Sequence, residues 1–343
     1  MPDVAAVLVN HMSADRMEAA IASIRGEFRE AGISGEVIVV DCASGAEEVR
    51  ALESLAPDRL LPLPDNRGYS GGVNAGLAQA RSPLILIANA DVELSRGCLA
   101  PLLEAASRSE VGAAAPVQYA DRGQRLLLPS GFPATFRDDL AQARARPGRP
   151  GDRRRFSRWA RLQWKLWQEG GDAPHLAGSI LAARKEVFNR VGRFDERFPF
   201  EYEETEWERR VQRAGLTLRV VAQARAWHFR GASSGRSPQA VLRARVSRDE
   251  YRRRFYGRLG AGLLERIERK RRGTAQIWTD TVIPARPGWA AAASPNASLL
   301  PFVGADLDSD LAVSELAAIL GSTFFLVVFE IASGMPEAIR SVA

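Results

Sequence analysis

Residues 84–91 read Leu84-Ile85-Leu86-Ile87-Ala88-Asn89-Ala90-Asp91, an apolar run followed by two polar residues in three positions. Because its apolar residues are continuous rather than alternating with polar ones, the run predicts a strand buried on both faces. Such strands belong to parallel sheets whose two faces are covered by helices. Alternate residues of an extended chain point the same way, so Asn89 and Asp91 share one face at the end of the strand. The stretch therefore predicts an α/β fold with a polar edge.

Similar runs lie on the N-terminal side of this stretch. Through the first 120 residues they alternate with helix-period segments, which indicates a parallel sheet with crossover helices in the order βαβαβαβ. Helix starts are marked by Asp15 and Ser44, each with a glutamate three residues later, and by Ser95 before an apolar segment. The further predicted strands are Val4–Asn10, Glu36–Asp41 and a weaker one near Arg59–Leu63.

The second half of the chain is less regular. Residues 137–172 form an insertion rich in Arg and Trp, and its helix either packs its tryptophans on the core as a lid or lies on an anionic surface. We expect a domain over 1–236, an Arg-rich helical extension over 237–272, and an acidic tail over 273–343. The tail is an oligomer contact or the start of a further domain. The later elements predicted are an ordered segment over 177–183, helices over 185–191 and 204–214, a strand over 216–221 and a helix over 239–272.

Charge is unevenly distributed along the 343 residues. The net charge is +6, but residues 1–120 carry 9 basic and 16 acidic groups, residues 121–272 carry 36 and 18, and residues 273–343 carry 2 and 7. Nearly all the basic residues are arginine, which suits bidentate contacts to phosphate, although a GC-rich genome also enriches arginine. A hydrophobic content of 46% with 26% charged residues is typical of a globular enzyme.

Several classes of protein are excluded or disfavoured. The loop after the first strand, from Asn10, contains neither of the glycine motifs of dinucleotide dehydrogenases and P-loop enzymes. Cys42 and Cys98 fit no metal or disulfide pattern, so a reducing, cytosolic setting is expected. The longest apolar run, Ala317–Phe329, is too short to span a membrane, and no signal sequence precedes Val4. The basic middle carries no nucleic-acid recognition motif, so no nucleic-acid partner is expected.

Two clusters carry chemistry beside the strand ends. Residues 65–76 are rich in Gly and Asn and run into a helix, so their backbone can approach a diphosphate closely. Asp91 beside a diphosphate is suited to hold Mg²⁺ or Mn²⁺. The second cluster is a run of four glutamates, interleaved with aromatics, that is either a solvated helix start or a site of proton transfer. Its glutamates are Glu201, Glu203, Glu204 and Glu206, with His228 at a later strand end.

These motifs follow one another in a specific order: Asp41, Asn66-x-Gly68, Gly71-Gly72-x-Asn74, Asn89-x-Asp91, Gly178, Phe194-Asp195-Glu196, Glu203-Glu204, and His228 with Ser233. The series resembles the inverting family 2 glycosyltransferases of GT-A fold, especially their rhamnosyltransferase-like branch, over about residues 4–235. The resemblance implies a Rossmann-like α/β fold of the nucleotide-diphospho-sugar transferases, with a mixed, mainly parallel sheet, flanking helices and a helical C-terminal extension.

The resemblance also implies a reaction and its partners. A sugar, with rhamnose from dTDP-rhamnose as the leading candidate, would move to a hydroxyl of a glycan or lipid-linked acceptor in cell-surface polysaccharide synthesis. Mg²⁺ or Mn²⁺ would be bound by Asp91 and His228, and Glu204 would be the base, with Glu203 able to share or take that role. Residues implied in donor binding are Asn10, Asp41, Asn66, Gly68, Gly71, Asn74, Asn89 and Asp91; those implied in acceptor binding are Gly178, Asp195, Glu196 and Trp207.

Two departures from the family pattern keep an alternative open. Asn89 stands where an Asp is common, and Glu203-Glu204 replaces a Glu-Asp pair. The alternative is therefore a sugar-nucleotide-binding or scaffold protein without catalysis. Because the basic insertion and the Arg-rich helix suit an anionic membrane surface, we expect a cytoplasmic protein with peripheral contact to the inner face of the plasma membrane. A homo-oligomer is a further candidate partner.

Overall fold

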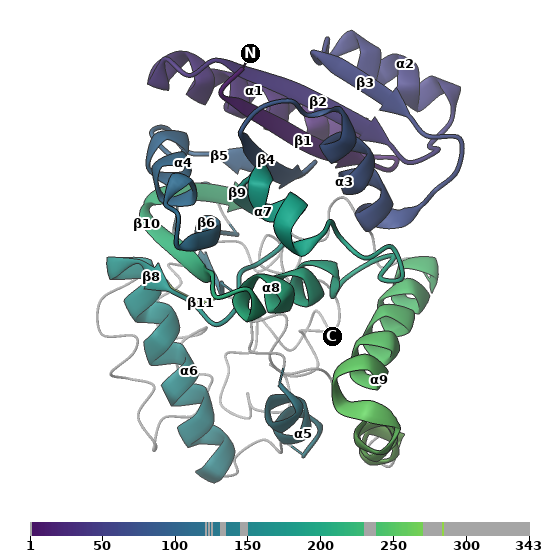
Figure 1. The fold of residues 1–343 in the computed structure, drawn as a ribbon, viewed down its shortest axis with the longest axis vertical. Coiled ribbons are helices and arrows are strands. Elements are labelled where there is room, and N and C mark those ends of the chain that lie inside the picture. The colour runs from purple at the N-terminus through teal and green to yellow at the C-terminus, as the bar shows by residue number, and fades with distance from the viewer. Residues whose placement is uncertain are drawn as a thin grey trace, which may run out of the picture.

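A mixed, mainly parallel sheet forms the centre of the fold in a computed structural model of the chain (Figure 1). The model describes residues 2–120, 122, 124, 126–130, 135–144, 150–229, 238–269 and 283–284. The predicted strand β4 (Leu84–Asn89) lies between parallel β1 (Val4–Asn10) and antiparallel β9 (Ile180–Arg184). Most of its residues are buried, as its continuous apolar sequence requires.

The other strands extend this sheet on both sides. The order is β11-β7-β6-β9-β4-β1-β2-β3, and β10 pairs with β5, β6 and β8. The remaining bounds are β2 (Gly35–Asp41), β3 (Arg59–Pro62), β5 (Val92–Leu94), β6 (Val111–Tyr119), β7 (Leu126–Leu128), β8 (Gly171–Asp172), β10 (Thr217–His228) and β11 (Ile283–Pro284).

The register of the parallel strands aligns their carboxyl ends. Asn10 on β1 lies opposite Asp41 on β2, and Val9 lies opposite Asn89 on β4. The strands predicted at residues 4–10, 36–41, 59–63 and 84–88 are all confirmed, within one residue at each end. The predicted polar edge therefore forms where three neighbouring strands end together.

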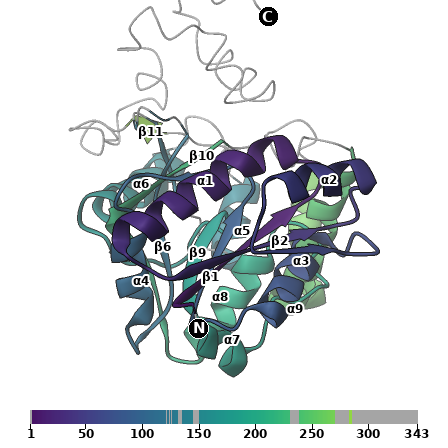
Figure 2. The same ribbon diagram turned by 90° about the horizontal axis from the view of Figure 1, so that it is seen from above.

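Helices cover both faces of the sheet (Figure 2). On one face, α1 (Ala14–Ala31), α2 (Ala46–Ser54) and α4 (Leu99–Ser107) bury residues such as Met17 and Leu102 against it. The opposite face is covered by α3 (Gly68–Gln79), α6 (Pro150–Glu169), α7 (Lys185–Val191) and α8 (Glu203–Arg213). The predicted helix starts at 185 and near 204 are confirmed.

The Arg- and Trp-rich insertion contributes to the core. Its helices are α5 (Phe136–Arg144) and α6, and Trp159 and Trp167 of α6 are buried in the core cluster beside β6 and β10. Of the two alternatives for this insertion, the burial of Trp159 and Trp167 favours the helix that packs its tryptophans on the core. These two side chains are not available to contact a lipid surface.

Two strands are longer or better defined than the sequence indicated. All nine residues of β6 are buried, but the alanines and Pro116 in it have low strand propensity, so the pattern did not reveal a separate strand. Pro116 lacks an N–H group, and the neighbouring β10 shifts register between Val221 and Arg225, next to this position. The pairing resumes after that irregularity, so β10 continues beyond the predicted end at residue 221 as far as His228.

The predicted Arg-rich helix is α9 (Pro238–Arg269), which is bent at Gly257, where φ is 69°. Its second limb folds back along the first, because Arg252 donates hydrogen bonds of 3.0 and 2.8 Å to Glu268. None of the helices in the described ranges is long and apolar enough to cross a membrane. The predicted tail over 273–343, apart from β11, and its apolar run lie outside the described residues.

Part of the glycine-rich segment is helical rather than a loop. Gly76 of α3 faces β1 so closely that a Cβ atom there would lie 2.3 Å from Val7 Cγ1.

We expect Gly76→Ala to destabilise the protein by about 1–3 kcal/mol, as overpacking of a core does, measured by urea unfolding. The matched control is Gly26→Ala in α1, which meets no atom within 4 Å and should be neutral or stabilising. Equal stability of the two variants would contradict this packing role.

Candidate active site

The carboxyl ends of β1 and β2 bring together two polar side chains. Asn10 Nδ2 donates a hydrogen bond of 2.8 Å to Asp41 Oδ1, and both residues are buried. The other carboxylate oxygen of Asp41 accepts a bond of 2.9 Å from the Ser44 backbone N–H. The structure therefore places the two predicted donor-binding residues in contact, and their nucleotide contact stays a prediction.

The loops that follow β1, β2 and β3 meet at this edge. Asn66 Nδ2 lies 3.2 Å from His11 Nε2, and Ser44 Oγ lies 3.5 Å from His11 Nδ1. Asn66 Oδ1 accepts a bond of 2.9 Å from the Gly68 N–H and one of 3.2 Å from Arg243 of α9. His11 and Arg243 were not predicted as site residues, because neither belongs to a sequence motif.

Asp91 and His228 are far apart in the sequence and close in space. The short strand β5 pairs antiparallel with the end of β10, so that His228 lies opposite Val92. His228 Nε2 is 3.4 Å from Asp91 Oδ1, and both side chains are largely shielded from solvent. Asn89, the last residue of β4, lies two residues before Asp91 in the chain and is partly exposed.

This pair suits a divalent ion that is shared with a substrate. The described part of the chain contains no cluster of three or more His, Cys, Asp or Glu residues that could hold a metal by itself. Mg²⁺ typically takes one or two protein ligands together with phosphate oxygens, so a pair consisting of Asp91 and His228 fits an ion held jointly with a diphosphate. It does not fit a fully enclosed structural metal site.

The acidic cluster begins α8 beside Gly178. A Cβ atom at Gly178 would lie 2.8 Å from Glu204 Cγ, so glycine permits this close approach. Glu203 is buried, and burial together with the charge of Glu204 raises the pKa of its carboxyl group well above the ordinary value. Among the described residues, Oε2 of Glu203 and Oε2 of Glu204 have no hydrogen-bond partner. Unbonded buried carboxylate oxygens are costly, and such groups gather at functional sites.

Tyr69 of α3 is partly buried and lies beside the segment that carries Gly178. Its hydroxyl lies 3.5 Å from the Gly178 carbonyl oxygen. The pKa of Tyr69 is raised by burial first and then by the negative charges of Glu203, Glu204 and Asp91. Sequence reasoning missed Tyr69, although it stands inside the glycine-rich segment that we singled out.

Other predicted residues fasten the loop after α7 to α3. Asn74 Nδ2 donates to the Phe194 carbonyl oxygen at 2.9 Å, and Asn74 Oδ1 accepts from the Phe194 N–H at 3.1 Å. Glu196 bonds Arg67 at 2.6 Å, and Asp195 bonds Arg197 at 2.6 Å, which lowers the pKa of the Asp195 carboxyl group. Their predicted roles in donor and acceptor binding stay predictions, and what the structure shows is a clamp between elements.

Gly68 and Gly71 have steric reasons to be glycine. Gly68 has a φ of 73°, and a Cβ atom there would lie 2.4 Å from the Pro199 carbonyl oxygen. At Gly71 a Cβ atom would lie 2.4 Å from Arg67 Cβ. Gly68 lets α3 approach the Pro199 region, and Gly71 leaves room for the Arg67 side chain at the start of the same helix. Their contribution to a donor pocket stays a prediction.

Trp207 is a correction to the acceptor-binding set. Its side chain is 0% exposed, stacks on Phe188 with ring centroids 4.7 Å apart, and donates to the Gly192 carbonyl oxygen at 3.0 Å. Because no face of the indole is open to a ligand, we assign Trp207 to the core.

A buried His–Glu pair lies behind the acidic cluster and was not predicted. His175 Nδ1 bonds Glu208, and the Glu208 carboxylate also accepts a bond of 3.1 Å from the Leu176 N–H. His175 Nε2 lies 3.4 Å from Thr205 Oγ1. The available signal was the four-residue spacing of Glu204 and Glu208, which places both on one side of α8.

This pair predicts a pH-dependent stability. Burial raises the pKa of Glu208 to about 7, although His175 opposes the shift. Burial lowers the pKa of His175, but Glu208 and Glu204 raise it more, so the net shift is upward. Each of these two groups has a higher pKa in the folded protein than in the unfolded chain, so the folded state favours its protonated form. This stabilises the fold fully at a pH below the unfolded pKa, and the stabilisation is lost as the pH rises through the folded pKa. We therefore expect a lower melting temperature at about pH 8.5 than at about pH 6.

A Glu208→Gln variant should show a smaller difference between these two pH values. Glu203 contributes a change of the same sign, so some dependence will remain. Glu104→Gln, at an exposed side chain, is the control. A melting temperature that increases with pH in the native protein would contradict the assignment.

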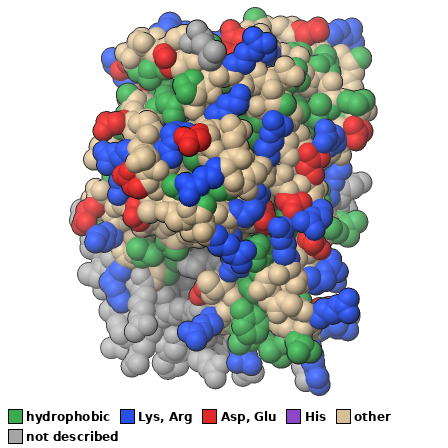
Figure 3. Space-filling view, viewed as in Figure 1, with side chains coloured by type: hydrophobic (Ala, Val, Ile, Leu, Met, Phe, Trp, Pro, Cys, Tyr) green, Lys and Arg blue, Asp and Glu red, His purple; other side chains and the backbone are tan. Residues whose placement is uncertain are grey.

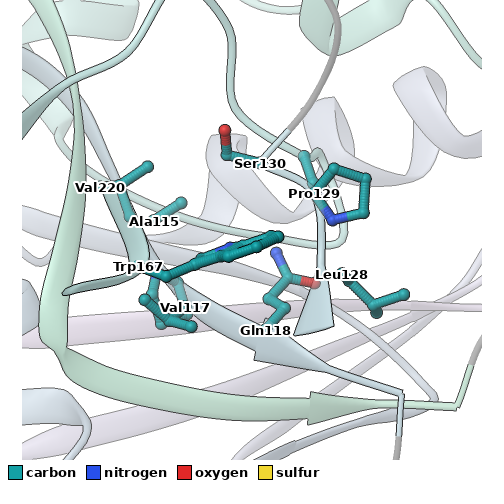
Figure 4. Close-up of a pocket in the computed structure, with 10 residues that line it drawn as sticks. Ala115, Val117, Gln118, Leu128, Pro129, Ser130, Trp167 and Val220 are labelled. Atoms are coloured by element: carbon teal, nitrogen blue, oxygen red, sulfur yellow. The ribbon is translucent and has the colours of Figure 1, made fainter. Parts of the chain in front are cut away.

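The small pocket under Trp167 is not part of this site. Its volume is about 10 Å³, room for a single water molecule, and it is lined by Val117, Gln118 and Ser130 among others (Figure 4). A larger cavity of about 270 Å³ is lined by Trp164, Gln168, Arg225 and neighbouring residues, and none of the predicted site residues lines it. The candidate site consists instead of the strand-end residues Asp41 and Asp91 and of Glu204 in the first turn of α8.

Comparison with known proteins gives the family. The sequence model of "Glycosyl transferase family 2" matches residues 5–192. Two curated proteins from strains of Mycobacterium tuberculosis, each called N-acetylglucosaminyl-diphospho-decaprenol L-rhamnosyltransferase, are 30% identical over 200 residues, which are 54% of this chain and 63% of theirs. The chain thus matches less than two thirds of the length of these relatives. The succinoglycan biosynthesis protein ExoO of Rhizobium meliloti is 36% identical over 94 residues, 26% of each chain.

Solved structures share the fold at low sequence identity. The mannosyltransferase PcManGT from Pyrobaculum calidifontis, in complex with GDP-Man and Mn²⁺, has a TM-score of 0.52 at 16% identity and covers 99% of this chain and 82% of its own. GalNAc-T7 with UDP, GalNAc and Mn²⁺ has a TM-score of 0.51 at 17% identity and covers 75% and 50%. The strand order, the family match and these neighbours together identify the chain as a member of glycosyl transferase family 2 with the GT-A fold.

Proposed function

We propose that this chain transfers a sugar from a nucleoside-diphosphate donor to an acceptor hydroxyl, with inversion at the anomeric carbon. One observation carries the proposal: the Asp91–His228 pair lies at the strand edge, the Glu204 carboxylate has a buried oxygen without a hydrogen-bond partner, and the partly buried Tyr69 is near enough for the charges of Asp91 and Glu204 to raise its pKa. A direct displacement needs two groups: a cation site that stabilises the leaving diphosphate, and a base that activates the acceptor hydroxyl.

Nucleotide binding and proton transfer are assigned to different residues of the chain. Asn10, Asp41 and Asn66, at the ends of β1 to β3, would hold the nucleotide, with His11 as a further contact at their rim. Glu204 would accept the proton of the acceptor hydroxyl. At the same time the hydroxyl oxygen of the acceptor bonds to the anomeric carbon, and the bond between that carbon and the diphosphate breaks. No covalent intermediate on the protein is required, so a single displacement inverts the anomeric configuration.

Asp91 and His228 would hold Mg²⁺ or Mn²⁺. The donor set fits, because a carboxylate oxygen and a ring nitrogen lie 3.4 Å apart at the strand edge where the diphosphate is expected. When bound, the ion would neutralise charge that develops on the leaving diphosphate. Both solved neighbours named above are complexes with Mn²⁺, which supports the choice of ion.

The donor is proposed to be dTDP-rhamnose, and the acceptor a glycan or lipid-linked glycan in polysaccharide synthesis. Support for the sugar comes from the mycobacterial rhamnosyltransferases at 30% identity. Support for the pathway class comes from the succinoglycan biosynthesis protein.

The experiment is a panel of nucleotide sugars, assayed for released nucleoside diphosphate in Mn²⁺ with and without acceptor. Turnover of dTDP-rhamnose above all other donors is expected. Preferential turnover of another donor would refute the choice of sugar and keep the reaction class. Tight binding of nucleoside diphosphate without turnover of any donor would instead favour the alternative that Asn89 and the Glu203-Glu204 pair suggest, a binding protein without catalysis.

A further inference from the structure

The tip of the α9 hairpin presents apolar side chains to solvent. Leu259, two residues after the bend at Gly257, is 91% exposed, and Leu263, one turn later, is 41% exposed. The opposite side of the same limb is packed, because Leu264 is 0% exposed and Gly260 lies against Phe136. The second limb is therefore an amphipathic helix whose outer row is apolar although the limb is already anchored on its inner row.

Arginines border this outer row. Arg258 and Arg266 flank the two leucines, and within the described residues neither has an ion-pair partner, whereas Arg252 and Arg254 are paired with acids. Figure 3 shows hydrophobic side chains bordered by Lys and Arg side chains at the lower end of α9. Exposed leucines between unpaired arginines match the surface of a helix that lies in a membrane interface.

We propose that the tip of α9, defined by Arg258, Leu259, Leu263 and Arg266, docks on an anionic lipid surface. The leucines would enter the boundary between headgroups and acyl chains, and the arginines would contact lipid phosphates. A second copy of the chain is a poorer occupant, because two leucines on a projecting tip supply far less area than the roughly 1,200–2,000 Å² of a stable interface. The proposal does not depend on the donor sugar or on catalysis.

The test is flotation of the full chain with vesicles of phosphatidylcholine alone or with one third phosphatidylglycerol. Binding to the anionic vesicles only is expected at about 0.1 M salt, and weaker binding at about 1 M. Leu259→Ser/Leu263→Ser and Arg258→Gln/Arg266→Gln should each weaken it at least about tenfold, with unchanged melting temperature and donor hydrolysis. The matched control is Leu162→Ser/Arg108→Gln, at exposed positions on α6 and directly after α4.

Three outcomes would overturn the proposal. The first is no flotation of the native chain, or equal flotation with neutral vesicles. The second is flotation of the tip variants at the native level. The third is self-association of the native chain without vesicles, measured by sedimentation, that the leucine variant abolishes, since the face would then serve a second copy.

A separate observation points to positioning residues for Glu204, and this inference rests on the proposed function. Glu208 fixes the backbone at Leu176 and bonds His175, while His175 reaches Thr205, the residue next to Glu204. Three residues after His175, Gly178 packs on the Glu204 stem. The geometry therefore assigns a positioning role to the His175–Glu208 pair. The pair sets the spacing between the segment 175–178 and α8, and this spacing places the Glu204 carboxylate.

Steady-state kinetics test this assignment. His175→Ala should lower kcat at least about tenfold with the KM for donor unchanged, because a misplaced base costs rate rather than ground-state binding. His175→Asn, which keeps a donor near the Nδ1 position, should restore most of kcat. A KM effect alone, or no rescue by Asn, would overturn the assignment, whereas failure of the proposed function would appear as no turnover by the native chain.

Discussion

A Glu204→Gln variant is expected to transfer sugar about 10²- to 10⁴-fold more slowly than the native chain, the usual contribution of a general base. Gln keeps the size of the side chain, and so its packing against Gly178, but it cannot accept a proton. Affinity for nucleoside diphosphate, measured by calorimetry, should be unchanged, because the base acts on the acceptor. The measurement is kcat with a saturating donor and acceptor.

Glu203→Gln is the matched control. Burial and the neighbouring Glu204 charge raise the pKa of the Glu203 carboxyl group well above its ordinary value, which favours the uncharged form over the carboxylate that a base requires. Its amide replacement should therefore change kcat only about two- to threefold, far less than loss of a base. If the large loss occurs at Glu203 and not at Glu204, the base assignment must be exchanged.

Residues at strand ends could be predicted from the sequence because two local rules coincide there. A continuous apolar run locates a buried parallel strand, and the next polar residues must then lie at the edge where ligands bind in open α/β sheets. Asp41, Asn89 and Asp91 were found in this way. The pairing of Asp91 with His228 was expected only from the family resemblance, since the antiparallel β5–β10 contact that produces it leaves no local signal.

Contacts between distant segments account for most of what was missed. Tyr69 lies inside a segment that was singled out for its backbone approach to a diphosphate. The helix that this segment runs into already begins at Gly68, and its glycines pack against β1 and the 199 region. His175 is one of three histidines in the chain and belongs to no motif. Its pairing with Glu208 depends on the position of α8 against the segment before β9, which pattern and propensity do not encode.

Trp207 illustrates the opposite error. It stands among glutamates at helical spacing, and from sequence an indole there can face either a sugar or the core. The structure buries it between Phe188 and Phe194, where its N–H group is satisfied by a backbone carbonyl. The same helix thus presents Glu204 on one side and a fully packed aromatic residue on the other, so spacing alone did not separate binding from packing.

The second large effect is expected at Asp91. Asp91→Asn removes one negative charge and keeps the size of the side chain, and we expect it to lower the transfer rate about 10²- to 10³-fold, as loss of one charge-stabilising group does. The variant should also need a higher Mn²⁺ concentration for half-maximal rate. Calorimetry of nucleoside diphosphate with and without Mn²⁺ provides a readout that is independent of turnover, and the enhancement by Mn²⁺ should disappear.

His228→Gln separates the two members of the pair. Because His228 Nε2 lies 3.4 Å from Asp91 Oδ1 on a different strand, its loss should shift the Mn²⁺ dependence about 10- to 100-fold and leave a rate that higher Mn²⁺ restores. Asp172→Asn, at an exposed carboxylate on β8, is the charge-matched control and should behave as the native chain does. An Asp91→Asn protein that is slow at every Mn²⁺ concentration but keeps the native half-maximal value would show that Asp91 positions the donor without binding the ion. The shared response of two residues that are distant in sequence is therefore what distinguishes a metal site from an isolated carboxylate at the end of a strand.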